Sequence, residues 1–375
     1  MSWNLISLGE ITNIRTGKLD ANASSANGEY PFFTCAREPL KISSFSYNCE
    51  CVLVAGNGDL NVKYYNGKFD AYQRTYIIES KSKEVLDVRY LFHFLDKYLV
   101  KLREQSIGGI IKYIKLGNLT EAKIPLPPLA EQRRIASILD QADELRQKRQ
   151  QAIEKLDQLL QATFIDMFGD PVSNPKGWDL VRVGEVVNEF IGGKNIECPD
   201  ESDSDYKILK VSAVTSKVYK PHESKFAPNT FEPNPLAIVE KGDLLFSRAN
   251  TTELVAATAY VWETPENIVL PDKLWKFSIS DESKVNKLYL WDLFKNIEFR
   301  NELSKLSSGT SGSMKNISKG KLNELKMPLP PKELQDKFAE FSTKLWGQIK
   351  TFQQSSDSLD SLFNSLQNQA FNGTL

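Results

Sequence analysis

The sequence predicts an α+β protein made of two copies of one unit, each a globular body followed by a long helix. The tetrapeptide at positions 125–128, Pro-Leu-Pro-Pro, recurs at positions 328–331, and an amphipathic segment follows each copy. A second match lies near the start of each copy: Trp3, Leu5, Gly9 and Glu10 correspond to Trp178, Leu180, Gly184 and Glu185. Because the two offsets are 203 and 175 residues, the second copy is 28 residues longer. Such duplication predicts a pseudo-twofold internal repeat.

Composition places the chain among folded globular proteins and argues against several site types. Its 375 residues favour two domains, with 41% apolar and 25% charged residues. We find no N-terminal targeting segment and no run of 18 apolar residues, so we expect a cytoplasmic protein without a membrane partner. Four cysteines without a CxxC pair and only two histidines predict neither a disulfide framework, nor a metal site, nor histidine-based catalysis.

The first body, residues 1–127, alternates short strands and turn signals before one helix. We expect strands at 5–14, 30–35, 51–55 and 74–79, and a helix at 88–102. Asn57-Gly58-Asp59 indicates a turn. Asn66-Gly67 suits a type I′ turn, so the segment 62–69 is predicted to form a hairpin.

Prolines 125, 127 and 128 end the first body, because proline fixes φ and lacks a backbone donor. A helix is then predicted at 128–168, about 60 Å long at 1.5 Å per residue. Its apolar residues recur with a heptad period and include the predicted interface residues Ile135, Leu139, Leu145 and Leu156.

The second body is predicted at 169–330 and a second long helix at 331–375. Residues 169–177 carry the glycines and prolines of an interdomain break. Strands are expected at 180–190, 207–213, 242–248, 254–262 and 274–279, a helical part at 285–306, and a flexible segment at 307–313. The final helix offers the apolar positions Phe338, Leu345, Phe352 and Leu359. Antiparallel pairing of the two long helices would bury both stripes; the alternative is that each packs on its own body.

The order of these elements resembles the specificity subunit of type I restriction-modification systems. The resemblance covers the whole chain and is carried by three features. These are the duplicated Gly-x-x-Lys-x-Ile motif beginning at Gly109 and Gly312, the run 115–135 around the first Pro-Leu-Pro-Pro, and the run 242–248, Gly-Asp-Leu-Leu-Phe-Ser-Arg. Glycine and polar residues in the second helix, at positions 347, 348, 355 and 356, depart from the pattern and weaken its seam.

The resemblance implies a sequence-specific DNA-recognition subunit that is not catalytic by itself. Each body would be a target recognition domain for one half of a bipartite, asymmetric site in double-stranded DNA. The helix pair, a coiled coil, would set the gap and dock two methyltransferase (modification) subunits, and restriction/translocase subunits would join them. The chain would direct adenine methylation and endonuclease activity, while S-adenosylmethionine, Mg²⁺ and ATP would be bound by the partners and no cofactor by this chain.

A net charge of −1 means that any DNA-binding site must be a local patch. Residues 1–124 hold 16 Lys and Arg against 13 Asp and Glu, a net charge of +3. Arginine and lysine suit guanine, and asparagine and glutamine suit adenine, whereas other cations contact phosphates. The DNA-binding candidates are Lys63, Tyr64, Lys68, Gln73, Arg74, Lys112 and Tyr113 in the first body, and Arg248, Asn250, Lys273, Lys315 and Asn316 in the second.

The motif positions of Lys112 and Lys315 favour phosphate contacts, and Gln73, Arg74, Arg248 and Asn250 are the candidates for base readout. Two other functions stay open. One is a coiled-coil scaffold whose bodies bind protein. The other is a self-sufficient Mg²⁺-dependent nuclease built on Asp272, Glu282 and Lys284, although such spacing arises easily by chance. The chain has no Gly-x-x-x-x-Gly-Lys-Ser/Thr loop and no Asn-Pro-Pro-Tyr/Phe element.

Overall fold

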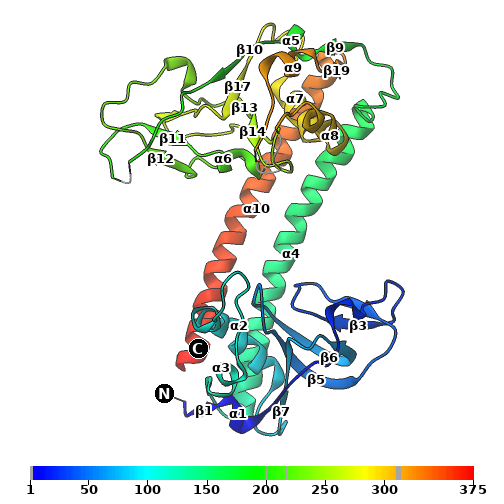
Figure 1. Cartoon of the computed structure of the whole chain (residues 1–375), viewed down its shortest axis with the longest axis vertical. Helices are drawn as coiled ribbons and strands as arrows, with labels where there is room; N and C mark the ends of the chain where they lie inside the picture. The colour runs from blue at the N-terminus through cyan, green and yellow to red at the C-terminus, as the bar shows by residue number, and fades with distance from the viewer. Residues whose placement is uncertain (1–2, 200, 217, 310–313) are drawn as a thin grey trace. The chain divides into compact units, whose positions relative to one another are not determined.

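We analysed a computed structural model that describes residues 3–199, 201–216, 218–309 and 314–375. Gly312 of the second motif, and most of the segment predicted to be flexible, lie outside these ranges. The chain divides into two compact units, residues 1–152 with 352–375 and residues 153–351. Each unit contains one globular body and part of both long helices, α4 (Leu129–Phe168) and α10 (Lys332–Asn372) (Figure 1).

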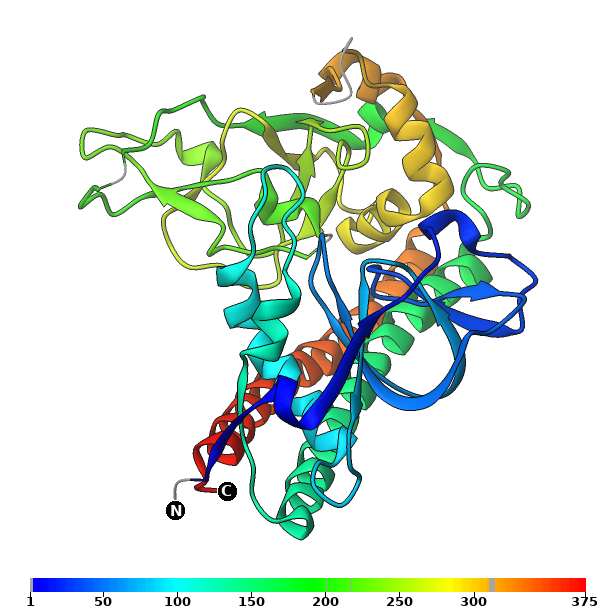
Figure 2. The ribbon, with the colours of Figure 1, turned by 60° about the horizontal axis from the view of Figure 1, so that its bottom comes forward.

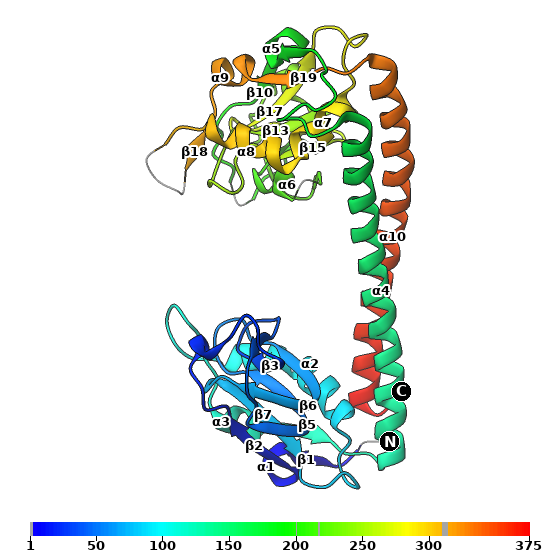
Figure 3. The same ribbon diagram turned by 90° about the vertical axis from the view of Figure 1, so that its right-hand side faces the viewer.

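The first body is built on a six-stranded sheet with the order β2-β7-β5-β6-β3-β4 (Figure 3). Neighbouring strands are antiparallel except β3 and β6, which are parallel. Helix α2 (Val88–Gln105) packs its apolar side against β5, β6 and the start of α4. The strands are β2 (Thr12–Thr16), β3 (Tyr30–Phe33), β4 (Leu40–Ile42), β5 (Tyr47–Ala55), β6 (Val62–Ala71) and β7 (Thr75–Ser80).

The second body repeats this topology with a more divided sheet. The order β10-β17-β13-β15 matches β2-β7-β5-β6, and β11 pairs in parallel with β16 as β3 does with β6. The strands are β10 (Val187–Gly192), β11 (Lys207–Leu209), β12 (Ser224–Phe226), β13 (Leu244–Ser247), β14 (Ala249–Asn250), β15 (Thr258–Tyr260), β16 (Ile268–Val269), β17 (Leu274–Ile279) and β18 (Lys315–Asn316). Two short strands, β15 and β16, thus occupy the position of the single strand β6. Part of the extra length of the second copy lies between β15 and β16.

In both bodies the first and last segments of the body are joined by equivalent short strands and helices. In the first, β1 (Leu5–Ser7) pairs with β8 (Lys123–Pro125), and α1 (Leu8–Ile11) contacts α3 (Leu116–Thr120). In the second, β9 (Leu180–Arg182) pairs with β19 (Lys326–Pro328), and α5 (Val183–Val186) contacts α9 (Lys319–Glu324). The remaining short helices are η1 (Ala21–Ala23), α6 (Ser212–Thr215) and η2 (Pro235–Ala237). The continuous strands predicted at 5–14 and 180–190 are therefore wrong, since a one-turn helix interrupts each.

The predicted hairpin turn at Asn66-Gly67 is also wrong. Both residues lie inside β6, where Asn66 is paired with Glu50 and Gly67 with Cys49 of β5. The turn of this hairpin lies earlier, at 56–61, where Gly58 has φ +71°. The nine residues of β5 keep β6 extended past Asn66, so tertiary pairing overrides the local turn preference.

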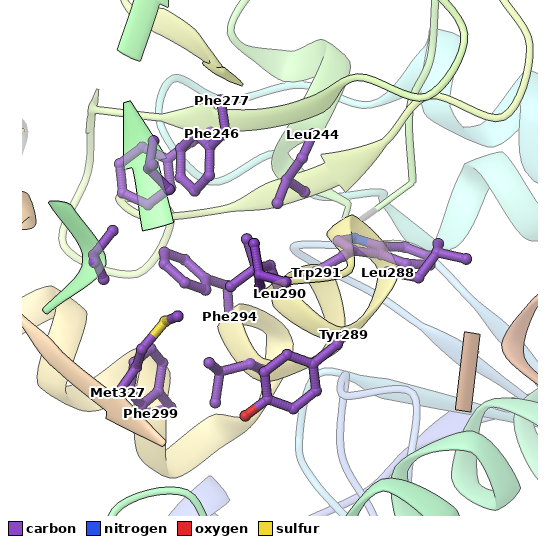
Figure 4. Packing of buried hydrophobic residues seen from close by; sticks show 14 of the residues in the cluster. Leu244, Phe246, Phe277, Leu288, Tyr289, Leu290, Trp291, Phe294, Phe299 and Met327 are labelled. Atoms are coloured by element: carbon purple, nitrogen blue, oxygen red, sulfur yellow. The ribbon is translucent and has the colours of Figure 1, made fainter. Parts of the chain in front are cut away.

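The helical part predicted at 285–306 is confirmed and consists of two helices, α7 (Lys287–Lys295) and α8 (Ile297–Lys305), divided at Asn296. Asn296 has an extended backbone, and its side chain accepts hydrogen bonds from the backbone of Glu298 and Phe299, which caps α8. Phe294 of α7 packs against Phe246 and Phe277 of the sheet, and Leu290 belongs to the same buried cluster (Figure 4).

Helices α4 and α10 pair within each unit. In the first, Phe363 is buried with Ile135 and Leu139, and Arg146 binds Asp360 at 2.5 Å. In the second, Phe338 packs against both Phe164 and Phe168, with ring centroids 5.5 and 5.4 Å away. Early residues of one helix thus meet late residues of the other, so the pairing is antiparallel as predicted.

Some of the residues predicted to lie in the contact between the two long helices are displaced by one position along the helix. Ile135, Leu139, Phe338 and Leu345 are buried, and Leu156, Phe352 and Leu359 are half-buried. Leu145, however, is 54% exposed, so its predicted place in the seam is wrong. The half-buried Arg146 occupies the contact position next to it, stacking 4.4 Å from the Phe363 ring, because a cation with a long apolar stem can line a seam. Among the described residues, no helix has the length and apolar character needed to cross a lipid bilayer.

A buried glutamine holds the start of each long helix to its body. Gln132 is fully buried; it accepts from the backbone N–H of Asp87 and donates to the carbonyls of Val85 and Pro127. In the second unit, Gln335 makes the same three bonds with Asn286, Lys284 and Pro330. A tyrosine donates to the last strand residue in each body: Tyr90 to Pro125 and Tyr289 to Pro328, both at 2.7 Å.

We expect Gln132→Leu to destabilise the first unit by about 2–4 kcal/mol, because it leaves buried backbone groups unpaired. The measurement is native-state hydrogen exchange of peptides covering 85–90 and 125–135. Gln141→Leu is the matched control, since Gln141 is exposed on the same helix and its amide donates to Ser137. Equal exchange in the two variants would contradict a structural role for the buried amide.

Candidate DNA-binding surface

One end of the first sheet brings together three segments that are distant in sequence. The backbone N–H of Gly56 donates to the carbonyl of Arg74 at 2.8 Å, and that of Gly58 donates to Lys112 at 2.9 Å. The loop 107–113 is closed by reciprocal bonds between Ile107 and Tyr113, of 3.0 and 2.9 Å. We call residues 56–58, 73–74 and 107–113 the first corner. Its loop, drawn in teal, projects beyond the sheet (Figures 2 and 3).

The second body builds the same arrangement. The backbone N–H of Arg248 donates to the carbonyl of Lys273 at 3.1 Å, as Gly56 does to Arg74. Ser308 and Asn316 exchange bonds of 2.9 and 3.0 Å, as Ile107 and Tyr113 do. We call residues 248–250, 272–273, 308–309 and 314–316 the second corner.

The corners place an arginine or a lysine at matching positions twice. Lys112 and Lys315 lie in the closing loops, as their motif predicts. Arg74 and Lys273 also correspond, because each precedes the matching strand, β7 or β17, and accepts the matching backbone bond. Sequence reasoning named both residues but missed their equivalence, because their spacing is 199 residues, not 203 or 175.

The exposed cations of the first corner are free of carboxylates. Among the residues that the structure describes, neither Arg74 nor Lys112 has an ion-pair partner, and both are exposed. Beside Arg74, Gln73 donates to Asp20 at 2.7 Å. Tyr113 is also exposed, so this end of the sheet presents two cations and a phenol to solvent.

In the second corner, Arg248 is held within the protein. Its Nε donates to the carbonyl of Asp272 at 2.6 Å and its Nη1 to Oδ1 of Asn316 at 2.9 Å. Its guanidinium lies 5.6 Å from the centre of the Trp275 ring. Arg248 therefore fixes the relative positions of the strands, and Asn316 is oriented by it. Lys315 donates to Gly309 at 2.8 Å, and Asn250 accepts from the backbone of Thr251.

Three predicted DNA-binding residues lie along β6, outside the residues that define the first corner. Tyr64 faces α2, donates to Glu50 at 2.9 Å and has Arg89 over its ring. Burial and this hydrogen bond raise the pKa of Tyr64 to about 12. The ammonium of Lys63 donates to Asn61, and burial lowers its pKa. Lys68 is exposed and lies 4.8 Å from the ring of Phe45. The fold thus engages Lys63 and Tyr64, while Lys68 faces solvent.

The residues of the nuclease alternative lie apart. Asp272 precedes β17 and Glu282 follows it, and a six-residue strand spans about 20 Å. One Mg²⁺ ion needs ligands at about 2.1 Å, so these two carboxylates cannot share it. Asp272 contacts Arg248 instead, and Lys284 pairs with Asp281. Within the described ranges, no group of three or more His, Cys, Asp or Glu residues could hold a metal ion. The nuclease interpretation of this segment is wrong.

The family model of the type I restriction modification DNA specificity domain matches residues 1–155 and 175–360. The type I restriction enzyme EcoDI specificity subunit of Escherichia coli is 42% identical over 140 residues, which cover 37% of this chain and only 31% of that protein. The type I restriction enzyme MjaVIII specificity subunit of Methanocaldococcus jannaschii is 25% identical over 365 residues, covering 90% and 84%.

A solved structure shares the fold. The S subunit of a type I restriction-modification system from M. genitalium superposes with a TM-score of 0.63 at 15% identity, covering 99% of this chain and 96% of that one. Its likeness extends over both bodies and both long helices.

Proposed function

Since the chain belongs to the type I restriction modification DNA specificity family, we propose that it reads a bipartite, asymmetric site in double-stranded DNA, one half with each body. One observation carries this proposal: the two corners have the same backbone construction and the same two cationic positions but different surrounding side chains. Two corners with the same backbone structure but different side chains suit a protein that binds two half-sites of different sequence with related geometry.

Within each corner we assign different tasks to different side chains. Lys112 and Lys315, on the closing loops, contact phosphates and set the register of each body on the duplex. Arg74 and Lys273 lie beside them at the start of the matching strands, so they contact either phosphates or guanine edges. Asn316, oriented by Arg248, offers an amide suited to adenine. Readout thus depends on loops carried by a rigid sheet.

We propose that the helix pair sets the gap between the half-sites and docks two methyltransferase subunits. Each helix is continuous across the boundary between the units. Exposed Leu145 and Leu159 of α4, and Leu362 of α10, offer apolar contacts for these partners. The chain is not catalytic in this proposal: S-adenosylmethionine, Mg²⁺ and ATP are bound by the methyltransferase and restriction subunits.

Selection of duplexes from a random pool tests this function. The complex of this chain with its methyltransferase subunits is expected to enrich DNA with two short conserved blocks at a fixed spacing. Enrichment of a single block would contradict reading by both bodies. A stable complex that retains no sequence above the starting pool would favour the scaffold function instead.

Removing the cation of one corner is expected to weaken binding without changing the preferred sequence, if that cation contacts phosphate. For Arg74→Ala and for Lys273→Ala we expect about 5–20-fold weaker binding and a salt dependence reduced by about one phosphate contact. The measurement is the affinity of the complex for its selected duplex between 50 and 200 mM salt. A changed base preference in one half, with the salt dependence intact, would instead assign that residue to base readout.

Two lysines at the opposite ends of the same strands serve as matched controls. Lys83 follows β7 and pairs with Glu50, and Lys284 follows β17 and pairs with Asp281. Their alanine variants remove the same charge outside the corners. Losses as large as those of Arg74→Ala would mean that net charge, not the corner, determines affinity.

A further inference from the structure

The loop 107–113 of the first corner ends in apolar side chains that the described chain does not cover. Ile110 is 105% exposed, the highest value among the large apolar side chains that the structure describes. Ile111 is 62% exposed, equal to Leu5 and Val100 and below Ile297. Water-exposed isoleucine gains nothing in the free protein, because its apolar area stays hydrated. An exposed tip of this kind marks a surface that binds something.

The base of this loop is fixed, although its tip is exposed. Ile107 and Tyr113 pair through their backbones, and the backbone N–H of the buried Ile114 donates to Gly56 at 2.9 Å. Gly108 has φ +116°, and a Cβ there would lie 2.6 Å from the carbonyl oxygen of Ile111. A glycine is therefore needed for the turn that carries Ile110 outward.

The surroundings of the tip favour a polyanion over a protein surface. Lys112 follows the two isoleucines directly, Lys115 lies three residues further on, and both are exposed. Lys112 also belongs to the corner that includes Arg74, through the bonds of Gly56 and Gly58. An apolar tip flanked by free cations has the chemistry of the wedge residues with which proteins open a base step while holding the adjoining phosphates.

The matching segment of the second body has a more polar sequence. The corresponding residues at 310–313 are Thr-Ser-Gly-Ser in the sequence, and they lie outside the described residues. Met314 is the apolar residue of that segment and is 49% exposed. In sequence, the residues before Lys315 thus include one apolar side chain, Met314, where two isoleucines precede Lys112.

We propose that Ile110, supported by Ile111, inserts between two base pairs of the half-site bound by the first body and unstacks that step. This inference rests on the proposed DNA-reading function and adds a distortion confined to one half-site. Lys112 holds an adjoining phosphate while the side chain enters the stack.

The experiment uses the complex with methyltransferase subunits and the selected duplex, with 2-aminopurine replacing, one at a time, each adenine on either strand of both half-sites except the methylated adenines. We expect fluorescence to rise at least about three-fold at one step of the first half-site on binding, because unstacking relieves quenching. Ile110→Ser should abolish this rise at saturating complex and weaken binding by about 3–30-fold. Met314→Ser, the matched change in the second body, should leave the signal unchanged.

Each outcome decides between specific alternatives. The wedge would be overturned if fluorescence rose at no position of the first half-site, or if it rose equally with Ile110→Ser. Sequence-specific retention of DNA in the same experiment would still support the proposed function. An Ile110→Ser chain that no longer binds its methyltransferase subunits would show that the tip contacts protein. Lys112→Ala should lower affinity but preserve the fluorescence rise per bound complex, which separates the wedge from its phosphate anchor.

Discussion

Phe338→Ala is expected to destabilise the second unit by about 3–5 kcal/mol. Phe338 is fully buried on α10 and packs against Phe164 and Phe168 of α4. Removing the ring leaves a cavity lined by these aromatic side chains, which the fixed helix backbones cannot close. It also weakens the contact between the two helices where they pass the second body.

Tryptophan fluorescence during urea unfolding measures this loss, since five of the six tryptophans, all but Trp3, lie in the second unit. We expect the midpoint to fall by more than about 1 M. Phe341→Ala is the matched control: Phe341 is half-buried on the same helix and in the same unit, so about 1–2 kcal/mol is expected. Equal shifts for the two variants would contradict the central place of Phe338.

Lengthening both long helices by one heptad is expected to widen the gap between the half-sites by about three base pairs, since seven residues add about 10.5 Å. The insertions follow Ile153 in α4 and Thr351 in α10, at the boundary between the units. Arg149 stacks on Phe352 near this level, so both insertions enter the pair at about the same height. Seven residues also return each seam to the same side of its helix.

The double insertion is measured by repeating the selection with the altered complex. Both blocks of the site should be unchanged, and only their spacing should grow. An insertion in α4 alone is the control; it puts the antiparallel seam out of register and should impair assembly. An unchanged gap after the double insertion would remove the helix pair from the role of spacer.

Much of the fold could be predicted from sequence because the repeat is marked by residues that permit few backbone conformations. Prolines at 125–128 and 328–331 end each body, and the heptad pattern after them predicts two long helices. Gln132 and Gln335 show why the segment repeats so closely: each amide bonds three backbone groups where helix and body meet. This signal was present in the sequence but was not used.

The errors arose where a local preference competed with tertiary pairing. Asn66-Gly67 has the composition of a turn but lies in a long strand, because β5 pairs with β6 on both sides of it. Leu145 matches the heptad pattern, yet Arg146 takes the contact position through Asp360 and Phe363. Only the folded sheet shows that Arg74 and Lys273 correspond, since insertions shift the spacing between them.

The most direct test of bipartite reading is the methylation pattern of a random DNA library in cells that express this chain with its methyltransferase subunit. Sequencing of modified bases should show one two-part motif with a fixed gap, methylated once in each half. Methylation scattered without a motif, or absent although the complex is well folded, would contradict the account and favour a scaffold that binds proteins through its two bodies.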